Sequence, residues 1–240
     1  MNCGHPVKSK ADWAAVLFAL GLPTAITWIY FVALAQHPPD LQQAAYLTGK
    51  VVQFVLPLVW VLLVQKQRLQ LRFPHWSELG QGALVGGAIV AAMLALYFVW
   101  FQHATVLATA AVEMRGRVDS FGLHGPGPFI AMALFYSLIH SLLEEYYWRW
   151  FVFGQLRRLT PLAVAVLVSS LGFMAHHVLV VAAYFGTFSL ETVILSLSVA
   201  VGGAIWACMY QRTGSLYATW TSHLLVDAGI FAVGYDMLRQ

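Results

Sequence analysis

Seven apolar segments limit how this chain can fold more than any other feature of its sequence. A helix needs about 20 predominantly apolar residues to cross the hydrocarbon core of a bilayer, and its backbone polar groups are then satisfied internally. The segments are Trp13–Ala35, Ala44–Val64, Gly82–Phe101, Pro128–Phe153, Pro161–Phe185, Leu190–Tyr210 and Ser215–Val233. They predict an all-α polytopic membrane bundle of about seven transmembrane helices, with eight as the alternative count.

The composition supports a membrane protein. Hydrophobic residues make up 60% of the 240 residues and charged residues only 10%, whereas soluble domains average about 25% charged residues. We therefore expect the lipid bilayer as a partner and a single integral membrane domain over residues 1–240. The formal net charge of +3 is too small to indicate nucleic acid as a partner, and the cysteines, Cys3 and Cys208, form no disulfide framework.

The basic residues between the segments predict an orientation, because cytoplasmic loops of membrane proteins are enriched in Lys and Arg. With the N-terminus in the cytoplasm, the inner side holds Lys8, Lys10, Lys66, Arg68, Arg72, Arg157, Arg158 and Arg212. The outer side then holds only Arg115, Arg117 and Arg239. The short loops and small size predict a bacterial inner (cell) membrane protein.

Two adjacent carboxylates and an arginine lie inside the fourth apolar segment. A charged side chain at the bilayer centre costs at least about 2.5–3.5 kcal/mol, so such residues pair with one another or perform chemistry. Arg149 lies one helical turn after Glu145, which predicts a buried ion pair. Glu144 points about 100° away on the helix and lines up with His140, so we expect Glu145 to be structural and Glu144 to be chemically active.

The fifth and seventh segments carry further ionisable residues. His223 and Asp227 are four residues apart and share a helix face, as do Phe173 and His177. His176 points to a different face, so we predict that it faces away from the site that His177 faces. Because polar side chains in lipid seek each other, the fourth, fifth and seventh segments should meet around one functional site.

These residue types suit hydrolysis of a peptide bond without a serine or cysteine nucleophile. A desolvated glutamate can act as a general base toward water, and a histidine beside a carboxyl group can donate a hydrogen bond to a developing oxyanion. The same groups could instead hold a divalent metal that activates the water. The H-E-x-x-H pattern of many metalloproteases is absent.

Three motifs together resemble those of a known family. Glu144-Glu145-x-x-x-Arg149, Phe173-x-x-x-His177 and His223-x-x-x-Asp227 are similar, in order and spacing, to the motifs of the CAAX protease and bacteriocin-processing (CPBP, Abi) family of intramembrane endopeptidases. That family includes the Ras-converting enzymes. The resemblance covers the chain from about Leu134 onward and implies that its catalytic helices lie within residues 128–236.

The resemblance also implies roles for these residues. Glu144 and His177 would activate the water, and His223 and Asp227 would stabilise the oxyanion or help to ligate a metal. The supporting residues would be Glu145, Arg149, Phe173 and His140. The family often has Asn where this chain has Asp227, and an ionised Asp cannot donate to an oxyanion, so Asp227 would have to be protonated or orient His223.

The resemblance therefore implies an intramembrane endopeptidase that cleaves a membrane-associated protein or peptide with a glutamate-activated water. We expect no cofactor, with zinc held by Glu144, His177, His223 and Asp227 as the alternative. A non-catalytic immunity or scaffold protein of the same fold is a second interpretation. A small transporter is a third, although transporters usually contain repeated halves and none is evident here.

Two further features concern packing. Residues 102–127 form the longest connection, and Thr105–Met114 predicts a short interfacial helix within it; we favour a connector over a flap at a substrate entrance. Ser198 and Gly202 form a small-xxx-small pair, which predicts close helix packing at the sixth segment.

Overall fold

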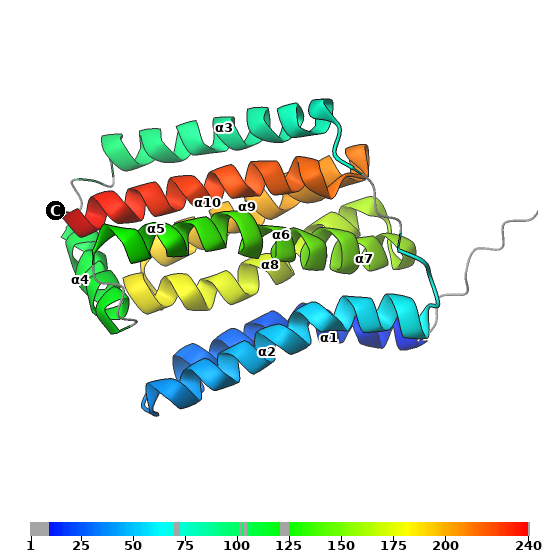
Figure 1. Ribbon diagram of the computed structural model, residues 1–240, viewed down its shortest axis with the longest axis horizontal. Coiled ribbons are helices and arrows are strands. Elements are labelled where there is room, and N and C mark those ends of the chain that lie inside the picture. The colour runs from blue at the N-terminus through cyan, green and yellow to red at the C-terminus, as the bar shows by residue number, and fades with distance from the viewer. Residues whose placement is uncertain (1–9, 70–72, 101, 103–104, 121–124, 240) are drawn as a thin grey trace, which may run out of the picture. The chain divides into compact units, whose positions relative to one another are not determined.

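The computed structural model describes residues 10–69, 73–100, 102, 105–120 and 125–239, and its regular structure over these residues is entirely helical. The α-helices (Figure 1) are α1 Lys10–Trp28, α2 Pro39–Val59, α3 Trp76–Val99, α4 Thr105–Ser120, α5 Pro126–Leu134, α6 Ser141–Glu145, α7 Gly154–Leu159, α8 Leu162–Phe185, α9 Leu190–Thr213 and α10 Leu216–Arg239. Wider π-helical turns cover Ile29–Ala33, Trp60–Val64, Phe135–His140 and Tyr146–Phe153. The predicted all-α fold is confirmed.

Six helical stretches in the described part of the chain are long and apolar enough to cross a membrane. They are Lys10–Ala33, Pro39–Val64, Trp76–Val99, Pro126–Leu159, Leu162–Phe185 and Leu190–Thr213, and they match the first six predicted segments. The seventh segment forms α10, a helix of 24 residues that is less apolar and carries His223, Asp227 and Asp236. The chain is therefore an integral membrane protein, and its described residues contain six apolar spans and one further helix of spanning length.

The chain divides into two compact units, each built from segments that are distant in sequence. The first contains residues up to 71, 147–180 and 193–208, and the second contains 72–146, 181–192 and 209–240. The boundary at 146/147 falls within the long fourth span, so one continuous helical stretch contributes to both units. A single membrane domain over residues 1–240 stays a prediction.

In the first unit, a proline inside α1 determines one specific contact. Pro23 has no N–H, so the carbonyl of Ala19 loses its partner within the helix. The hydroxyl of Tyr147 donates to that carbonyl at 2.7 Å, and Tyr147 is fully buried. In lipid, where water cannot satisfy a backbone carbonyl, this hydrogen bond both stabilises α1 and fixes it against the fourth span.

In the second unit, α3 lies beside α10 at very close range (Figure 1). A Cβ at Gly86 would lie 2.8 Å from Cα of Ser222, and a Cβ at Gly82 would collide with the carbonyl oxygen of Ala218. Only glycine at these positions lets the two backbones approach so closely, as small residues do at membrane helix interfaces. The contact fixes the position of the α10 turn that carries His223.

Each end of α10 is held by hydrogen bonds. The hydroxyl of Ser215 donates to Glu78 Oε2 at 2.8 Å just before the helix begins. Near its other end, Tyr97 donates to Asp236 Oδ2 at 2.7 Å and Arg115 donates to the carbonyl of Leu238 at 2.7 Å. Arg115 lies on α4, so the expected helix in the long connection exists and is longer than predicted.

The predicted close packing at Ser198 and Gly202 is wrong. Ser198 is exposed and hydrogen-bonds the carbonyl of Ile194 in its own helix. A Cβ at Gly202 would meet only the ring of Trp206, also on α9, at 3.8 Å. The glycine on α9 that does pack closely is Gly203, where a Cβ would lie 3.3 Å from Phe173 and Ser170 on α8.

Candidate active site

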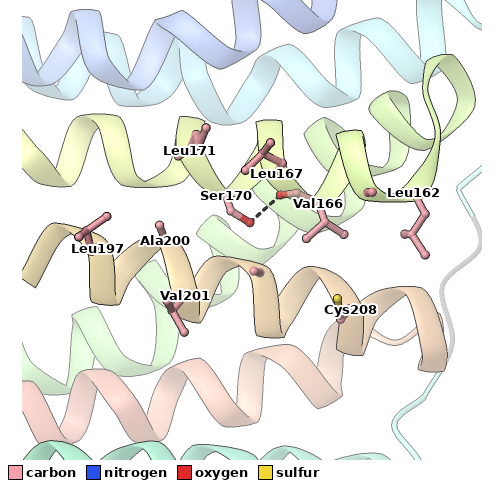
Figure 2. A pocket seen from close by; sticks show the side chains of 11 residues that line it. Leu162, Val166, Leu167, Ser170, Leu171, Leu197, Ala200, Val201 and Cys208 are labelled. Atoms are coloured by element: carbon pink, nitrogen blue, oxygen red, sulfur yellow. Dashed lines mark hydrogen bonds between the residues drawn. The ribbon is translucent and has the colours of Figure 1, made fainter.

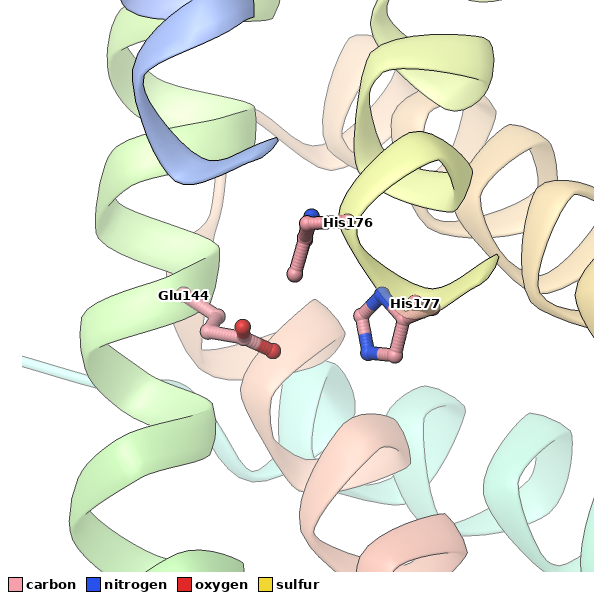
Figure 3. A group of neighbouring side chains, drawn as sticks. All are labelled: Glu144, His176 and His177. Carbon is pink, nitrogen blue, oxygen red and sulfur yellow. The ribbon is translucent and has the colours of Figure 1, made fainter. Parts of the chain in front are cut away.

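The two carboxylates of the fourth span lie on one short α-helical turn between two π-helical stretches. Glu144 and Glu145 end α6, which follows Phe135–His140 and precedes Tyr146–Phe153. Their side chains are 3% and 0% exposed, and Figure 3 shows Glu144 extending from this helix. π-Helical insertions are frequent at functional sites, so the local backbone agrees with a functional role for this turn.

The imidazole ring of His223 on α10 lies among three carboxylates of the second unit. Its Nδ1 lies 2.8 Å from Oε1 of Glu145, with both side chains buried. Its Nε2 lies 3.7 Å from Oε2 of Glu144 and 3.6 Å from Oδ1 of Asp227. One imidazole ring therefore contacts three carboxylates.

The bond to Glu145 determines which nitrogen of His223 faces the other two carboxylates. A carboxylate accepts hydrogen bonds, so Nδ1 carries the proton and donates to Glu145. Nε2 then points toward Glu144 and Asp227, at distances too long for direct hydrogen bonds and suited to a bridging water. This arrangement can hold a water or a substrate oxygen between an imidazole nitrogen and a carboxylate.

Two further contacts in the second unit involve the helical turns next to Glu144. Nε2 of His140 lies 4.0 Å from Oε1 of Glu144, as expected for residues four apart. The indole N–H of Trp220 donates to the carbonyl of Leu138 at 3.0 Å, which ties α10 to the π-helical turn before Glu144. The helix that carries His223 and the helix that carries Glu144 are thus connected directly.

The α8 histidines belong to the first unit and differ in their surroundings (Figure 3). Nδ1 of His177 lies 2.8 Å from the carbonyl of Phe173. A carbonyl only accepts, so Nδ1 donates and the neutral ring presents its lone pair at Nε2. His176 is 4% exposed, and its ring lies parallel to that of Trp148 at 5.7 Å. That His177 and not His176 faces the substrate stays a prediction.

Arg149 is buried among aromatic rings of the first unit. Its guanidinium carbon lies 4.6 Å from the ring centre of Phe173 and 5.0 Å from that of Trp206, and the side chain is 2% exposed. Desolvated cation–π contacts of this kind contribute about 2 kcal/mol. Phe173 also packs edge-on against His177 at 4.7 Å, so it links Arg149 to the histidine. The Glu145–Arg149 ion pair stays a prediction.

The sequence of these helices matches a known family. Residues 126–229 match the family model described as Type II CAAX prenyl endopeptidase Rce1-like. This segment of the chain is therefore similar to the CAAX protease family. No curated protein and no solved structure shows significant similarity to the chain.

The similarity to the CAAX protease family bears on the coarse function. The matched model describes an endopeptidase, and the apolar helices place the chain in a lipid bilayer. Together these findings support a protein of the intramembrane protease kind. The matched segment runs from the start of α5 into α10 and includes Glu144, His177, His223 and Asp227.

Sequence reasoning missed the partner of His223. The departure from the family's Asn left two roles open for Asp227, as a protonated donor or as the group that orients His223, but Glu145 binds Nδ1 and Asp227 lies on the Nε2 side. A relation between residues 78 positions apart in sequence leaves no periodic signal. The burial cost of a carboxylate predicts that Glu145 needs a partner, but the spacing pointed to Arg149 and gave no sign of His223.

Zinc accepts imidazole nitrogens and carboxylate oxygens, and zinc binding stays the alternative to a metal-free site. In the zinc alternative, Glu144, His177, His223 and Asp227 would hold the ion, and Glu145 would fix the ring of His223 as carboxylates commonly fix metal-bound histidines. A bound zinc would polarise a water or a carbonyl oxygen.

Proposed function

We propose that this chain is an intramembrane endopeptidase of the CAAX protease type, which hydrolyses a peptide bond of a membrane-associated protein or peptide with a water activated by Glu144. The observation that supports this most strongly is the buried His223, whose ring is held by Glu145 at Nδ1 and turns Nε2 toward Glu144 and Asp227. The arrangement supplies a general base and a neighbouring hydrogen-bond donor on one side of a buried polar site.

In the proposed reaction, Glu144 takes a proton from water as the water oxygen attacks the substrate carbonyl carbon. His177 is proposed to assist this step, as the family resemblance implies, with Nε2 as its accepting nitrogen because Nδ1 donates to the carbonyl of Phe173. Glu144 then returns the proton to the leaving amine as the C–N bond breaks. One carboxylate thus acts first as base and then as acid.

His223 and Asp227 are proposed to bind the oxygen of the substrate carbonyl. A protonated Nε2 donates to the oxyanion, and the Glu145 carboxylate stabilises the positive ring from the opposite nitrogen. Since Glu145 already orients His223, Asp227 is assigned to the oxyanion side of the ring, where its carboxyl group donates in the protonated form. We expect Asp227→Asn to retain cleavage activity, because an amide can donate to the same oxygen, and Asp227→Leu to lose it.

We favour a metal-free reaction, because Glu144 needs no ion to act as a base. We further propose a bacterial inner membrane location with the N-terminus in the cytoplasm, on the basis of the distribution of Lys and Arg between the loops. Reporter fusions at Ala35, before α2, and at Gln65, after it, would test the orientation. Only the fusion at Gln65 should report a cytoplasmic location.

The test of the peptidase function compares Glu144→Gln with Glu113→Gln. Glu113 is exposed on α4, so its change removes the same charge outside the site. Membrane peptides from cells that produce each variant are compared by mass spectrometry, and purified proteins are assayed on the peptides that differ. A full-length protein should accumulate only with Glu144→Gln.

Identical peptide profiles for the wild-type protein and Glu144→Gln would refute the proposed peptidase function. If cells that produce Glu144→Gln also behaved like cells that produce the wild-type protein, the non-catalytic immunity or scaffold function would replace the peptidase function. Such a role needs the fold but not the Glu144 carboxylate. Loss of solute uptake with unchanged peptide profiles would instead support a transporter.

A further inference from the structure

An apolar groove runs between α8 and α9 in the first unit, on elements that carry none of the proposed catalytic carboxylates (Figure 2). Its volume is about 820 Å³. The α8 wall is formed by Leu162, Ala163, Val166, Leu167, Ser170 and Leu171, and the α9 wall by Leu197, Ala200, Val201, Ala204 and Cys208. The only hydroxyl among these, that of Ser170, donates to the carbonyl of Val166, so the lining offers a ligand nothing but apolar contact.

Small side chains on α9 create the groove. Ala200, Ala204 and Cys208 are spaced four residues apart and therefore lie on one face of the helix. Larger neighbours border it and project outward, with Leu167 and Val201 each 59% exposed. Because α8 and α9 are both membrane spans, the medium that contacts this groove is the hydrocarbon of the bilayer.

The length and position of the groove match one leaflet. Leu162 is the first residue of α8, and Cys208 lies in the last turns of α9, so the groove begins at the membrane boundary. From there it extends over Leu162–Leu171 and Cys208–Leu197, which is about 14–16 Å along the helices. Half of the ~30 Å hydrocarbon core is about 15 Å, the depth reached by the acyl chain of a lipid in that leaflet.

Positive charge lies at the same end. Arg157 and Arg158 form the last turn of α7, and only Thr160 and Pro161 separate that helix from Leu162. Arg158 is exposed. Basic residues at the boundary end of a cleft between membrane helices are the usual partners of anionic lipid headgroups.

We propose that the groove between α8 and α9 binds one acyl chain of an anionic phospholipid, with Arg157 and Arg158 holding its headgroup. This site is separate from the proposed reaction, and no catalytic step depends on it. The apolar lining of the groove favours an acyl chain, and the length of the groove matches a lipid in one leaflet. The two arginines favour a negatively charged headgroup over a zwitterionic one.

The experiment uses the full chain in lipid nanodiscs that contain phosphatidylcholine and a small fraction of phosphatidylglycerol with a photoreactive acyl chain. Cross-linked residues are mapped by mass spectrometry in the wild-type protein, in Ala204→Phe, which fills the groove, and in Ser198→Phe, which adds the same ring at an exposed position of α9 outside it. We expect cross-links concentrated on the groove walls, lost in Ala204→Phe and kept in Ser198→Phe.

The headgroup contact is tested by competition with unlabelled phosphatidylglycerol or phosphatidylcholine. We expect Arg157→Gln combined with Arg158→Gln to reduce the preference for the anionic lipid by about tenfold, which corresponds to about 1.4 kcal/mol. Lys66→Gln combined with Arg68→Gln, which removes two exposed charges elsewhere in the first unit, should leave the preference unchanged.

Several results would overturn the proposal. Cross-links spread evenly over all lipid-facing helices and unaffected by Ala204→Phe would show that the groove holds no particular lipid. A dimer in native mass spectrometry that Ala204→Phe dissociates would identify a second copy of the chain as the occupant. Protection of the groove by a lipid-modified peptide, with no preference between the two phospholipids, would assign it to substrate.

Discussion

Gly86 and Gly87 are adjacent on α3 but have opposite surroundings, which makes them a matched pair for testing how α10 is positioned. A Cβ at Gly86 would lie 2.8 Å from both Cα and the carbonyl oxygen of Ser222, whereas a Cβ at Gly87 would meet nothing within 4 Å. Replacing either by Ala removes the same backbone flexibility from a helix interior. The two variants therefore differ only in what the new methyl group contacts.

The magnitudes follow from these distances. Gly→Ala in a helix interior stabilises by about 0.5–1 kcal/mol, and both variants gain this equally. At Gly86 the methyl group meets backbone atoms that cannot rotate away, and such overpacking costs about 1–3 kcal/mol. Gly86→Ala should therefore be less stable than Gly87→Ala by about 1–3 kcal/mol, with α10 shifted away from α3.

Thermal unfolding in detergent, followed by tryptophan fluorescence, measures the difference. For a chain of this size 1 kcal/mol corresponds to about 2–4 °C, so the midpoints should differ by about 2–12 °C. Because His223 follows Ser222 directly, cleavage of a peptide substrate should fall as well, by up to about 100-fold for a displacement of 1 Å. Equal midpoints and equal activities for the two variants would refute the positioning of α10 by α3.

Four further changes test other contacts. Glu145→Ala leaves His223 buried without its 2.8 Å partner and should destabilise the protein by about 3–5 kcal/mol. Glu145→Gln keeps an acceptor, so this variant should stay folded and lose peptidase activity by about 10–100-fold. Full activity in both variants would exclude a role for the hydrogen bond between Glu145 and His223. Tyr147→Phe exposes the Ala19 carbonyl to an apolar interior and should lower the free energy of unfolding by about 1–3 kcal/mol; an unchanged midpoint would count against that contact. Arg149→Ala should lower the free energy of unfolding by about 3–5 kcal/mol and reduce the yield of folded protein. Normal expression with normal activity would contradict a structural role for Arg149. Finally, metal-stripped protein should keep its peptidase activity while Glu144→Gln loses it, and activity restored only by stoichiometric zinc would replace the metal-free reaction with a zinc-dependent one.

The membrane spans could be predicted from sequence because hydropathy acts locally along the chain. Six of the seven predicted segments form long apolar helices, and the seventh forms α10. The same reasoning singled out Glu144 and Glu145, since a carboxylate in an apolar span is costly wherever its partner lies. These predictions needed no knowledge of which helices touch.

Contacts between helices could not be predicted in this way. A regular α-helix turns by 100° per residue, but Phe135–His140 and Tyr146–Phe153 are π-helical. Residues on either side of Glu144 are therefore rotated from the directions that a regular helix predicts. The glycine contacts show a second limit. Ser198 and Gly202 satisfy the small-xxx-small spacing without a partner helix at that position, whereas Gly82 and Gly86 satisfy it and contact α10. Spacing identifies helices able to pack closely, and only the tertiary structure decides which ones do.

The hydrogen bond from Tyr147 to Ala19 joins residues 128 positions apart, and this separation has a consequence for synthesis. The first span leaves the ribosome and enters the bilayer long before the fourth span exists. During that interval the carbonyl opposite Pro23 has no donor within its own helix, in a medium that supplies none. α1 is therefore inserted as an incomplete helix and reaches its final stability only when the fourth span arrives beside it. A chain arrested before Tyr147 would keep this defect in its first helix, which is the kind of exposed polar group that distinguishes an unfinished membrane protein from a finished one.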